Sequence, residues 1–266
     1  MTTVEMALEL PGSLTPAREF AQASPSMFVI PAYNEELNLP RLFEDLESRP
    51  ALFPNGSRII IVDDGSQDRT AELITDYAGP LPIELLSMGK NQGPGAAFRA
   101  GFAAALEHCP DDGYVVTLEA DTTSDLDALP RMLERAEAGA ELVLASWKMQ
   151  NVSRRRRALS AAAGVVVRLT LGVEAKTVSS FFRVYRAGTL RSAIERYGDG
   201  FVRERGFACK AEILANLARL GARIEEVQVD LDWSRREGES KMPVFKTMLC
   251  YWRMLARQSV AREPAV

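Results

Sequence analysis

Short apolar runs alternate with segments of helical periodicity along most of the chain. Five nearly continuous apolar runs stand out: Met27–Pro31, Arg58–Val62, Ile83–Met88, Tyr114–Leu118 and Leu142–Ser146. Runs of this length that do not alternate with polar residues are typical of strands buried on both faces of a parallel sheet. The segments between them have helical spacing: Leu37–Ser48, Arg69–Tyr77, Ala96–Glu107 and Asp127–Glu137. The pattern predicts an α/β fold in a single domain, with a mostly parallel central sheet and helices on both faces.

The second half of the chain is less regular. It predicts a short strand over Phe181–Tyr185, a helix over Gly206–Leu220 and a strand with one wet face over Arg223–Leu231. Arg154–Leu171 has the pattern of a helix with a basic start and an apolar body, and Pro243–Arg262 that of an amphipathic helix. We therefore divide the chain into a flexible N-terminal extension (1–26), one domain (27–242) and a C-terminal amphipathic helix and tail (243–266).

Composition narrows the class of protein. The chain has 266 residues, of which 47% are hydrophobic, and this is enough for one α/β domain that needs no disulfides. Its three scattered cysteines favour a reducing compartment and no zinc site. A net charge of −4 argues against a non-specific nucleic-acid partner. With no secretory signal and no run of about 20 apolar residues, we expect a cytoplasmic protein that does not cross the membrane.

Carboxylates follow three of the predicted strands. Glu35, Asp63 with Asp64, and Glu119 with Asp121 come at or just after strand ends. In an open parallel sheet ligands bind beyond the carboxyl ends of the strands, and crowded carboxylates are tolerated where a cation or hydrogen-bond donors offset them. Caps of the following helices are the structural alternative.

These residues suggest a metal and nucleotide site. Glu119 and Asp121 have the spacing to flank one hard divalent cation that shares its other positions with phosphate. Asp63 or Asp64 could hold a nucleoside, and Tyr33 could stack on its base. The glycine-rich stretch Lys90–Ala97 resembles a phosphate cradle but lacks the ending of a P-loop, so close packing at a helix start is favoured. A single histidine excludes histidine-based metal sites and serine triads.

The motifs PAYNEELNLPRLFEDL, IIIVDDGSQDRT, KNQGPGAAFRAGFAAAL and TLEADTTSDLDALPRML resemble family 2 glycosyltransferases, which have the GT-A fold. Downstream, VSSFFRVYRAGTL, GFACKAEILANLARLGARIEEVQVDL and RREGESKM resemble the dolichol-phosphate (polyprenyl-phosphate) mannose synthases within that family. The resemblance covers about Met27–Pro243. It implies a nucleotide-sugar donor, a Mg²⁺ or Mn²⁺ cofactor and a polyprenyl-phosphate acceptor.

The resemblance also implies roles for individual residues. It places Pro31, Tyr33 and Glu35 at the donor nucleotide, Asp63 and Asp64 at the nucleoside, and Ala120 against the donor. Asp121 matches the central metal-binding aspartate, with Glu119 and Thr123 as further candidate ligands. Arg235 and Lys241 match residues near the donor diphosphate or sugar. We predict catalytic roles for the three residues Asp121, Arg235 and Lys241.

Three departures from the family pattern concern the site. Glu119 stands where the family commonly has aspartate, and Thr123 where it often has glutamine. The family's Asp-Pro-x-Ser-Gly-Phe becomes Lys176–Phe181, without the aspartate and the glycine. The longer carboxylate arm and the weaker ligand change the geometry of the metal site. The missing aspartate and glycine bear on the sugar and the acceptor, so GDP-mannose is the first of several donors that we expect.

The absence of the family's catalytic base from the sequence indicates the class of acceptor. The family's catalytic base is often an aspartate in a Glu-Asp pair, and Gly206–Glu212 contains no such pair. A phosphate acceptor needs no base because it is already ionised near neutral pH, so the sequence favours an inverting transfer to a lipid phosphate. Glu212 is a stand-in base or, as we prefer, a structural residue.

A run of four arginines suggests how the chain contacts a membrane and the acceptor. Arg154, Arg155, Arg156 and Arg157 precede an apolar helix and could receive the acceptor phosphate over anionic lipid, at the cytoplasmic membrane face. A solvated basic face is the alternative. A membrane-anchoring partner or a homo-oligomer fits this picture. Two other functions stay open: a UDP-sugar transferase with a hydroxyl acceptor, and a catalytically weak donor-binding or scaffold subunit.

Overall fold

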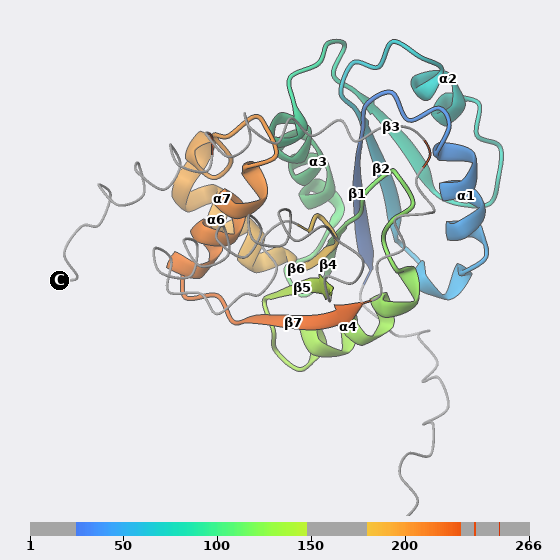
Figure 1. Ribbon diagram of the computed structural model, residues 1–266. Coiled ribbons are helices and arrows are strands. Elements are labelled where there is room, and N and C mark those ends of the chain that lie inside the picture. The colour runs from blue at the N-terminus through green and yellow to red at the C-terminus, as the bar shows by residue number, and fades with distance from the viewer. Residues whose placement is uncertain (1–24, 148–179, 230–236, 238–249, 251–266) are drawn as a thin grey trace, which may run out of the picture.

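The protein is described by a computed structural model over residues 25–147 and 180–229, together with Glu237 and Cys250. Over these ranges the chain forms one seven-stranded sheet in the order β3-β2-β1-β4-β6-β5-β7 (Figure 1). The strands are β1 (Ser26–Ala32), β2 (Arg58–Asp63), β3 (Ile83–Ser87), β4 (Tyr114–Thr117), β5 (Leu142–Trp147), β6 (Arg183–Arg186) and β7 (Ile224–Val229). All neighbouring pairs are parallel except those of β6, which runs antiparallel to β4 and β5. The predicted mostly parallel sheet is confirmed.

Helices connect the strands. Within the described residues they are α1 (Leu39–Glu47), α2 (Thr70–Thr75), α3 (Pro94–His108), α4 (Leu129–Glu137), α6 (Ala187–Tyr197) and α7 (Cys209–Arg219), with short 3₁₀ turns at Pro50–Leu52, Leu126–Ala128 and Gly198–Gly200. The sequence pattern did not predict α6. Its apolar positions are few, and they become recognisable only because Leu190 and Ala193 are fully buried against the sheet.

Two hydrophobic cores lie on opposite faces of the sheet. Because successive strand residues point to opposite faces, Met27 and Val29 of β1 enter one core while Phe28 and Ile30 enter the other. Helices α3, α6 and α7 cover the first face, and α1 and α4 cover the second (Figure 1). Helices on both faces are thus confirmed, and the near-continuous apolar runs of the strands follow from this double burial.

One strand departs from its prediction. Ile83–Met88 was expected to be buried on both faces, but β3 is the edge strand beyond β2, and its residues Glu84 and Ser87 are exposed. An edge strand has a neighbour on one side only, so part of its surface stays in contact with solvent.

Several predicted segments fall outside the described residues. They are most of the N-terminal extension, the helix Arg154–Leu171 and, apart from Cys250, the C-terminal segment 243–266. The strand β1 begins at Ser26, so the last residue assigned to the extension belongs to the sheet. None of the helices in the described ranges combines the length and the apolar character that a bilayer crossing requires.

Candidate active site at the carboxyl ends of the strands

The sheet order brings the predicted acidic strand ends together. Strand β1 pairs with β2 on one side and with β4 on the other, both in parallel. Ala32 lies opposite Asp63 in the register, and the backbone N–H of Asp64 donates to the carbonyl of Ala32 at 2.9 Å. The segments that follow β1, β2 and β4 therefore leave the same edge of the sheet, as the sequence predicted.

The loop after β1 is joined to the loop after β2 by reciprocal hydrogen bonds. The N–H of Asn34 donates to Ser66 Oγ at 2.9 Å, and the N–H of Gln67 donates to Asn34 Oδ1 at 2.8 Å. Asn34 has a positive φ of 53°, a conformation that asparagine adopts more readily than most residues. The two loops thus behave as one unit, which holds the position of any ligand-binding group on either of them.

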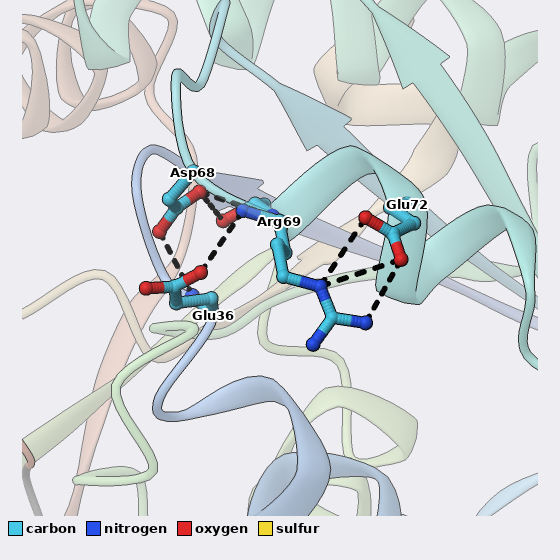
Figure 2. A network of polar contacts seen from close by, with 5 residues as sticks. Glu36, Asp68, Arg69 and Glu72 are labelled. Atoms are coloured by element: carbon cyan, nitrogen blue, oxygen red, sulfur yellow. Dashed lines mark hydrogen bonds and ion pairs between the residues drawn. The ribbon is translucent and has the colours of Figure 1, made fainter.

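A polar network extends this junction to the start of α2. Figure 2 shows Glu36 and Asp68 facing each other: the N–H of Glu36 donates to Asp68 at 3.2 Å, and the N–H of Arg69 donates to Glu36 at 3.0 Å. Arg69 also forms an ion pair with Glu72 at 2.8 Å. The side chains of Glu36 and Asp68, which are outside the predicted site residues, therefore join the two loops, whereas the Arg69–Glu72 pair stays at the start of α2.

The predicted donor contacts on the β1 loop differ in how buried they are. Pro31 and Tyr33 are partly exposed, whereas Glu35 is buried. The carboxylate of Glu35 accepts a hydrogen bond from Asn38 Nδ2 at 2.6 Å, and its N–H donates to Thr70 Oγ1 at 2.7 Å. Tyr33 is the more accessible of the two polar candidates, and Glu35 has a structural partner within its own loop.

Asp64 binds the glycine-rich loop. Its two carboxylate oxygens accept the N–H groups of Gln92 at 2.7 Å and of Gly93 at 2.8 Å. The N–H of Gly95 donates to the carbonyl of Arg205 at 2.8 Å. These three N–H groups therefore bind protein oxygens and do not form a phosphate cradle. Close packing at the helix start is the alternative that the sequence favoured. Burial raises the pKa of Asp64, and the two N–H groups oppose that rise.

Asp63 is equally buried but has a different partner. One of its carboxylate oxygens accepts the N–H of Ser66 at 3.0 Å, and its carbonyl accepts the N–H of Met88 at 2.9 Å. Asp63 and Asp64 are each 3% exposed. Of the two aspartates, Asp64 is the one whose two oxygens both bind backbone.

A tight turn presents Asp121 at the end of β4. Thr122 has a φ of 59°, an uncommon conformation for a β-branched residue. Next to it, Thr123 donates to Asp121 Oδ1 through its hydroxyl at 2.6 Å and through its N–H at 3.3 Å. Ala120 is buried beside them. Asp121 and the hydroxyl of Thr123 are therefore brought together, as a shared metal site requires, on a strained backbone.

The carboxylate of Glu119 has other hydrogen-bond partners than that of Asp121. One carboxylate oxygen accepts the N–H of Phe181 at 2.9 Å, and the other accepts the hydroxyl of Ser124 at 2.7 Å. Burial, and then the nearby charge of Asp121, raise the pKa of Glu119. Both of its oxygens thus have hydrogen-bond donors within the protein.

The sequence did not predict Lys210 as a residue of the site. This residue lies in the first turn of α7 with 7% exposure, and its Nζ sits 3.7 Å from the ring centroid of Phe181 and 5.4 Å from that of Phe207. Burial lowers the pKa of Lys210 to about 8, and the carboxylates of Glu119 and Asp121 oppose the shift. No sequence motif signals this cation, because its neighbours come from segments far apart in the chain.

Glu212 has a structural partner. Its carboxylate accepts the N–H of Glu204 at 2.7 Å, and only 6% of the residue is exposed. Burial raises its pKa, and the N–H groups of Glu204 and Arg203 oppose the rise. The carboxylate fastens the segment before α7 to the helix, which agrees with the preferred structural role.

Two groups of predicted site residues lie outside the described ranges: Arg235 with Lys241, and the run Arg154–Arg157. Glu237 is described, and it binds the loop after β1. The N–H of Glu237 donates to Asn38 Oδ1 at 3.0 Å, and Asn38 Nδ2 donates to the carbonyl of Glu237 at 3.3 Å. Asn38 joins this residue of the RREGESK segment to Glu35 and hence to the site.

The described residues contain no group of three or more His, Cys, Asp or Glu side chains arranged to hold a metal ion. A cation at Asp121 would therefore need ligands beyond such side chains, such as the Thr123 hydroxyl and oxygens of a bound diphosphate. A site that binds the metal ion and the nucleotide diphosphate together supplies such ligands.

Comparison with known families now adds to this geometry. The model of "Glycosyl transferase family 2" matches residues 27–198, which include the carboxyl ends of β1, β2 and β4. The chain belongs to glycosyl transferase family 2. The predicted family is thereby confirmed.

Similar proteins include two transferases that are named for undecaprenyl phosphate. An undecaprenyl-phosphate mannosyltransferase from Micrococcus luteus is 35% identical over 224 residues, covering 80% of this chain and 86% of the relative. An undecaprenyl-phosphate 4-deoxy-4-formamido-L-arabinose transferase from Pseudomonas fluorescens is 33% identical over 160 residues. That match covers 59% of this chain and 46% of the relative, so the chain spans about half the length of the arabinose transferase.

Among solved structures, the fold is similar to that of glucosyl-3-phosphoglycerate synthase from Mycobacterium tuberculosis. The structure with Mn²⁺, UDP-glucose and phosphoglyceric acid aligns with a TM-score of 0.68 at 18% identity, covering 97% of this chain and 88% of the synthase. At this identity the likeness concerns the fold, and it confirms the predicted GT-A architecture.

Proposed function

We propose that this protein is an inverting glycosyltransferase that moves a sugar from a nucleotide-sugar to a polyprenyl or dolichyl phosphate, with mannose from GDP-mannose as the first choice of donor. One observation carries the choice of acceptor: the carboxylate of Glu212, the candidate base, is bound to the N–H of Glu204. An acceptor that is already ionised needs no such base. The two named undecaprenyl-phosphate transferases among the relatives support the same acceptor class.

The nucleotide-sugar donor binds at the edge of the sheet where β1, β2 and β4 end. Asp63 binds the nucleoside there, Tyr33 stacks on the base, and Pro31, Glu35 and Ala120 pack around the nucleotide. Asp64 contributes by fixing the glycine-rich loop, through the N–H groups of Gln92 and Gly93. Arg235 and Lys241 donate charge-assisted hydrogen bonds to the diphosphate or the sugar.

The proposed cofactor is Mg²⁺ or Mn²⁺. Asp121 and the hydroxyl of Thr123 offer hard oxygen ligands at one turn, which suits either ion, and Glu119 is the further predicted ligand. Such an ion offsets the negative charge that develops on the departing diphosphate. The M. tuberculosis synthase, which has a similar fold, was crystallised with Mn²⁺ and UDP-glucose, and this supports the choice of a divalent ion.

A direct assay tests the proposal. The purified protein is incubated with polyprenyl phosphate, Mg²⁺ or Mn²⁺, and a panel of radiolabelled GDP- and UDP-sugars. We expect label to enter the lipid fraction with a GDP-sugar, GDP-mannose first. Transfer from a UDP-sugar to a saccharide instead would replace the proposed donor and acceptor. No transfer to any acceptor, with retained nucleotide binding, would favour the scaffold alternative.

The Asp121→Asn variant is the matched control for the metal. It keeps the size of the side chain but removes the charge that a divalent cation requires. We expect metal-dependent binding of the nucleotide diphosphate to be lost, which isothermal calorimetry measures with and without a chelator. Equal affinity in the variant and the wild type would contradict the role given to Asp121.

A further inference from the structure

Asn38 stands at the N-terminal cap of α1, but its side chain does not cap the helix. Asparagine at this position commonly accepts an N–H group of the first helical turn. Within the described residues the Asn38 side chain makes no such bond, although its carbonyl accepts the N–H of Leu42 at 2.9 Å. The N–H groups of Asn38 and Leu39 both donate to the carbonyl of Glu35, at 2.9 and 3.0 Å. The next residue, Pro40, has no N–H group, so the helix begins without the Asn38 side chain.

The amide of Asn38 instead binds the main chain of Glu237. Oδ1 accepts the N–H of Glu237 at 3.0 Å, and Nδ2 donates to the carbonyl of the same residue at 3.3 Å. Opposite residues of an antiparallel ladder exchange the same pair of hydrogen bonds. Asn38 is 4% exposed, whereas Glu237 is exposed. A buried amide thus holds a surface segment that is 199 residues away in the chain, and it does so through the peptide backbone.

The loop that carries Asn38 is itself fixed to the body of the domain. Asn38 Nδ2 also donates to the carboxylate of Glu35 at 2.6 Å, and the N–H of Glu35 donates to Thr70 Oγ1 at 2.7 Å. One residue earlier, the N–H of Asn34 donates to Ser66 Oγ at 2.9 Å. Glu237 is therefore joined through one side chain to the unit formed by the loops after β1 and β2.

In the sequence, Glu237 lies between the two basic residues that are proposed to bind the donor. Arg235 precedes it by two residues, and Lys241 follows it by four. Since a chain spans at most about 3.3–3.6 Å per residue, their Cα atoms lie within about 7 Å and about 14 Å of that of Glu237. Fixing the backbone at Glu237 therefore limits how far either cation lies from the loop after β1.

We propose that Asn38 is a positioning residue, which holds the backbone of Glu237 against the loop after β1 and so keeps Arg235 and Lys241 close to the donor. The inference rests on the proposed function, which assigns these two cations to the diphosphate or the sugar. A segment that is held before the ligand arrives loses less conformational freedom on binding. Loss of the Asn38 contacts should therefore weaken donor binding although Asn38 does not touch the donor.

A mutant cycle on donor binding tests the role of Asn38. Calorimetry with Mn²⁺ measures the affinity for GDP-mannose, and in parallel for UDP-glucose, and NMR titration measures that for guanosine and uridine. The proteins are the wild type, Asn38→Ala, Arg235→Met/Lys241→Met and the triple variant. We expect Asn38→Ala to bind the nucleotide-sugar about tenfold more weakly and the nucleoside within about threefold of the wild type. In the variant without the two cations, Asn38→Ala should change the affinity by less than about twofold.

The outcomes separate this inference from the proposed function. Equal losses for nucleotide-sugar and nucleoside, additive effects in the triple variant, or wild-type affinity in Asn38→Ala would each overturn the role of Asn38. The proposed function stands in all three cases if Arg235→Met/Lys241→Met binds the nucleotide-sugar more weakly. A wild type that binds neither nucleotide-sugar contradicts the proposed function itself.

A pair of substitutions at Glu237 tests the main-chain contact alone and leaves the bond between Asn38 and Glu35 in place. Alanine keeps the N–H that Asn38 Oδ1 accepts, whereas proline has none. We expect Glu237→Pro to bind the nucleotide-sugar about fivefold more weakly than Glu237→Ala, and this difference should disappear in the Asn38→Ala background. Equal affinities in Glu237→Pro and Glu237→Ala, or a difference that persists without Asn38, would overturn the inference. If Asn38→Ala does not fold, the comparison at the exposed Glu237 decides.

Discussion

At the residue scale, Asp64 shows how a motif residue can act through the backbone. Sequence reasoning offered Asp63 or Asp64 as a contact to the nucleoside, without a means to separate them. In the structure both oxygens of Asp64 accept N–H groups of the glycine-rich loop, while Asp63 binds the N–H of Ser66. Asp64 therefore shapes the site by fixing the loop, and Asp63 is the better candidate for direct donor contact.

Replacing Asp64 by asparagine tests whether this residue fixes the glycine-rich loop rather than binding the donor. The amide group can accept only one of the two N–H groups and places its own N–H₂ against the other, so we expect the free energy of unfolding to fall by about 1–3 kcal/mol in urea denaturation. Asp76→Asn, at an exposed position, is the control and should change it by less than about 0.5 kcal/mol. Unchanged stability together with lost nucleotide affinity would instead make Asp64 a direct ligand.

Two buried thiols predict a pH dependence. Burial raises the pKa of Cys109 to about 11 and that of Cys209 to about 12, from an ordinary value of 9.0. Above pH 9 these thiols ionise in the unfolded chain but not in the folded one. Their contribution to stability is therefore complete below pH 9 and is lost as the pH rises towards 11 and 12.

The expected loss is about 1.4 kcal/mol per thiol for each pH unit within that window. Urea unfolding under reducing conditions at pH 8 and pH 10 measures it, with Cys109→Ala/Cys209→Ala as the comparison. The variant should lose less stability than the wild type between these two pH values. Equal losses would show that other groups cause the alkaline destabilisation.

At the element scale, the start of α3 is packed directly on the segment before α7. A Cβ atom at Gly95 would lie 1.9 Å from the carbonyl oxygen of Glu204, and one at Gly93 would lie 2.4 Å from that of Arg205. Gly93 also has a φ of 92°, which favours glycine. The glycine-rich motif is therefore required for two reasons. The backbones of the start of α3 and of the segment before α7 are in contact, and Asp64 accepts hydrogen bonds from the N–H groups of the motif.

A pair of glycine substitutions tests this contact. In Gly95→Ala the new methyl group must displace backbone, so we expect a loss of about 1–3 kcal/mol or more in the free energy of unfolding. Gly206→Ala is the matched control, because an added Cβ there meets nothing within 4 Å. Chemical denaturation of both variants measures the difference, and an equally stable Gly95→Ala would refute the close packing.

At the scale of the whole molecule, the proposed membrane association rests on a segment outside the described residues. We propose that Arg154–Arg157 contact anionic lipid and receive the acceptor phosphate. Replacing all four with serine should weaken binding to anionic vesicles by about tenfold or more, since each arginine near the surface contributes about 1 kcal/mol. Vesicle flotation at two salt concentrations measures the change.

A control of equal charge distinguishes this surface from general electrostatics. Arg131, Arg135, Arg196 and Arg219 are exposed on described helices, and the four serine substitutions at these positions change the net charge by the same amount. Flotation should be nearly unaffected in that variant. Equal loss in both variants, or in neither, would rule out a specific role for the run.

The sequence by itself determined the elements and the class of fold. Apolar runs and helical spacing are local properties, so β1, β2, β4 and β5 and the helices between them were predicted close to their observed bounds. The acidic strand ends were also predicted, because parallel strands release their carboxyl ends at one edge. The edge position of β3 was not, since burial depends on neighbours that the local pattern does not contain.

Only the tertiary structure decided which residues meet. Lys210 reaches the site because α7 packs beside the segment before β6, and Glu119 binds Phe181, which is 62 residues away in the chain. The antiparallel insertion of β6 between β4 and β5 creates that neighbourhood. Contacts of this kind arise from long-range packing and charge compensation, which no periodicity or spacing in the sequence encodes.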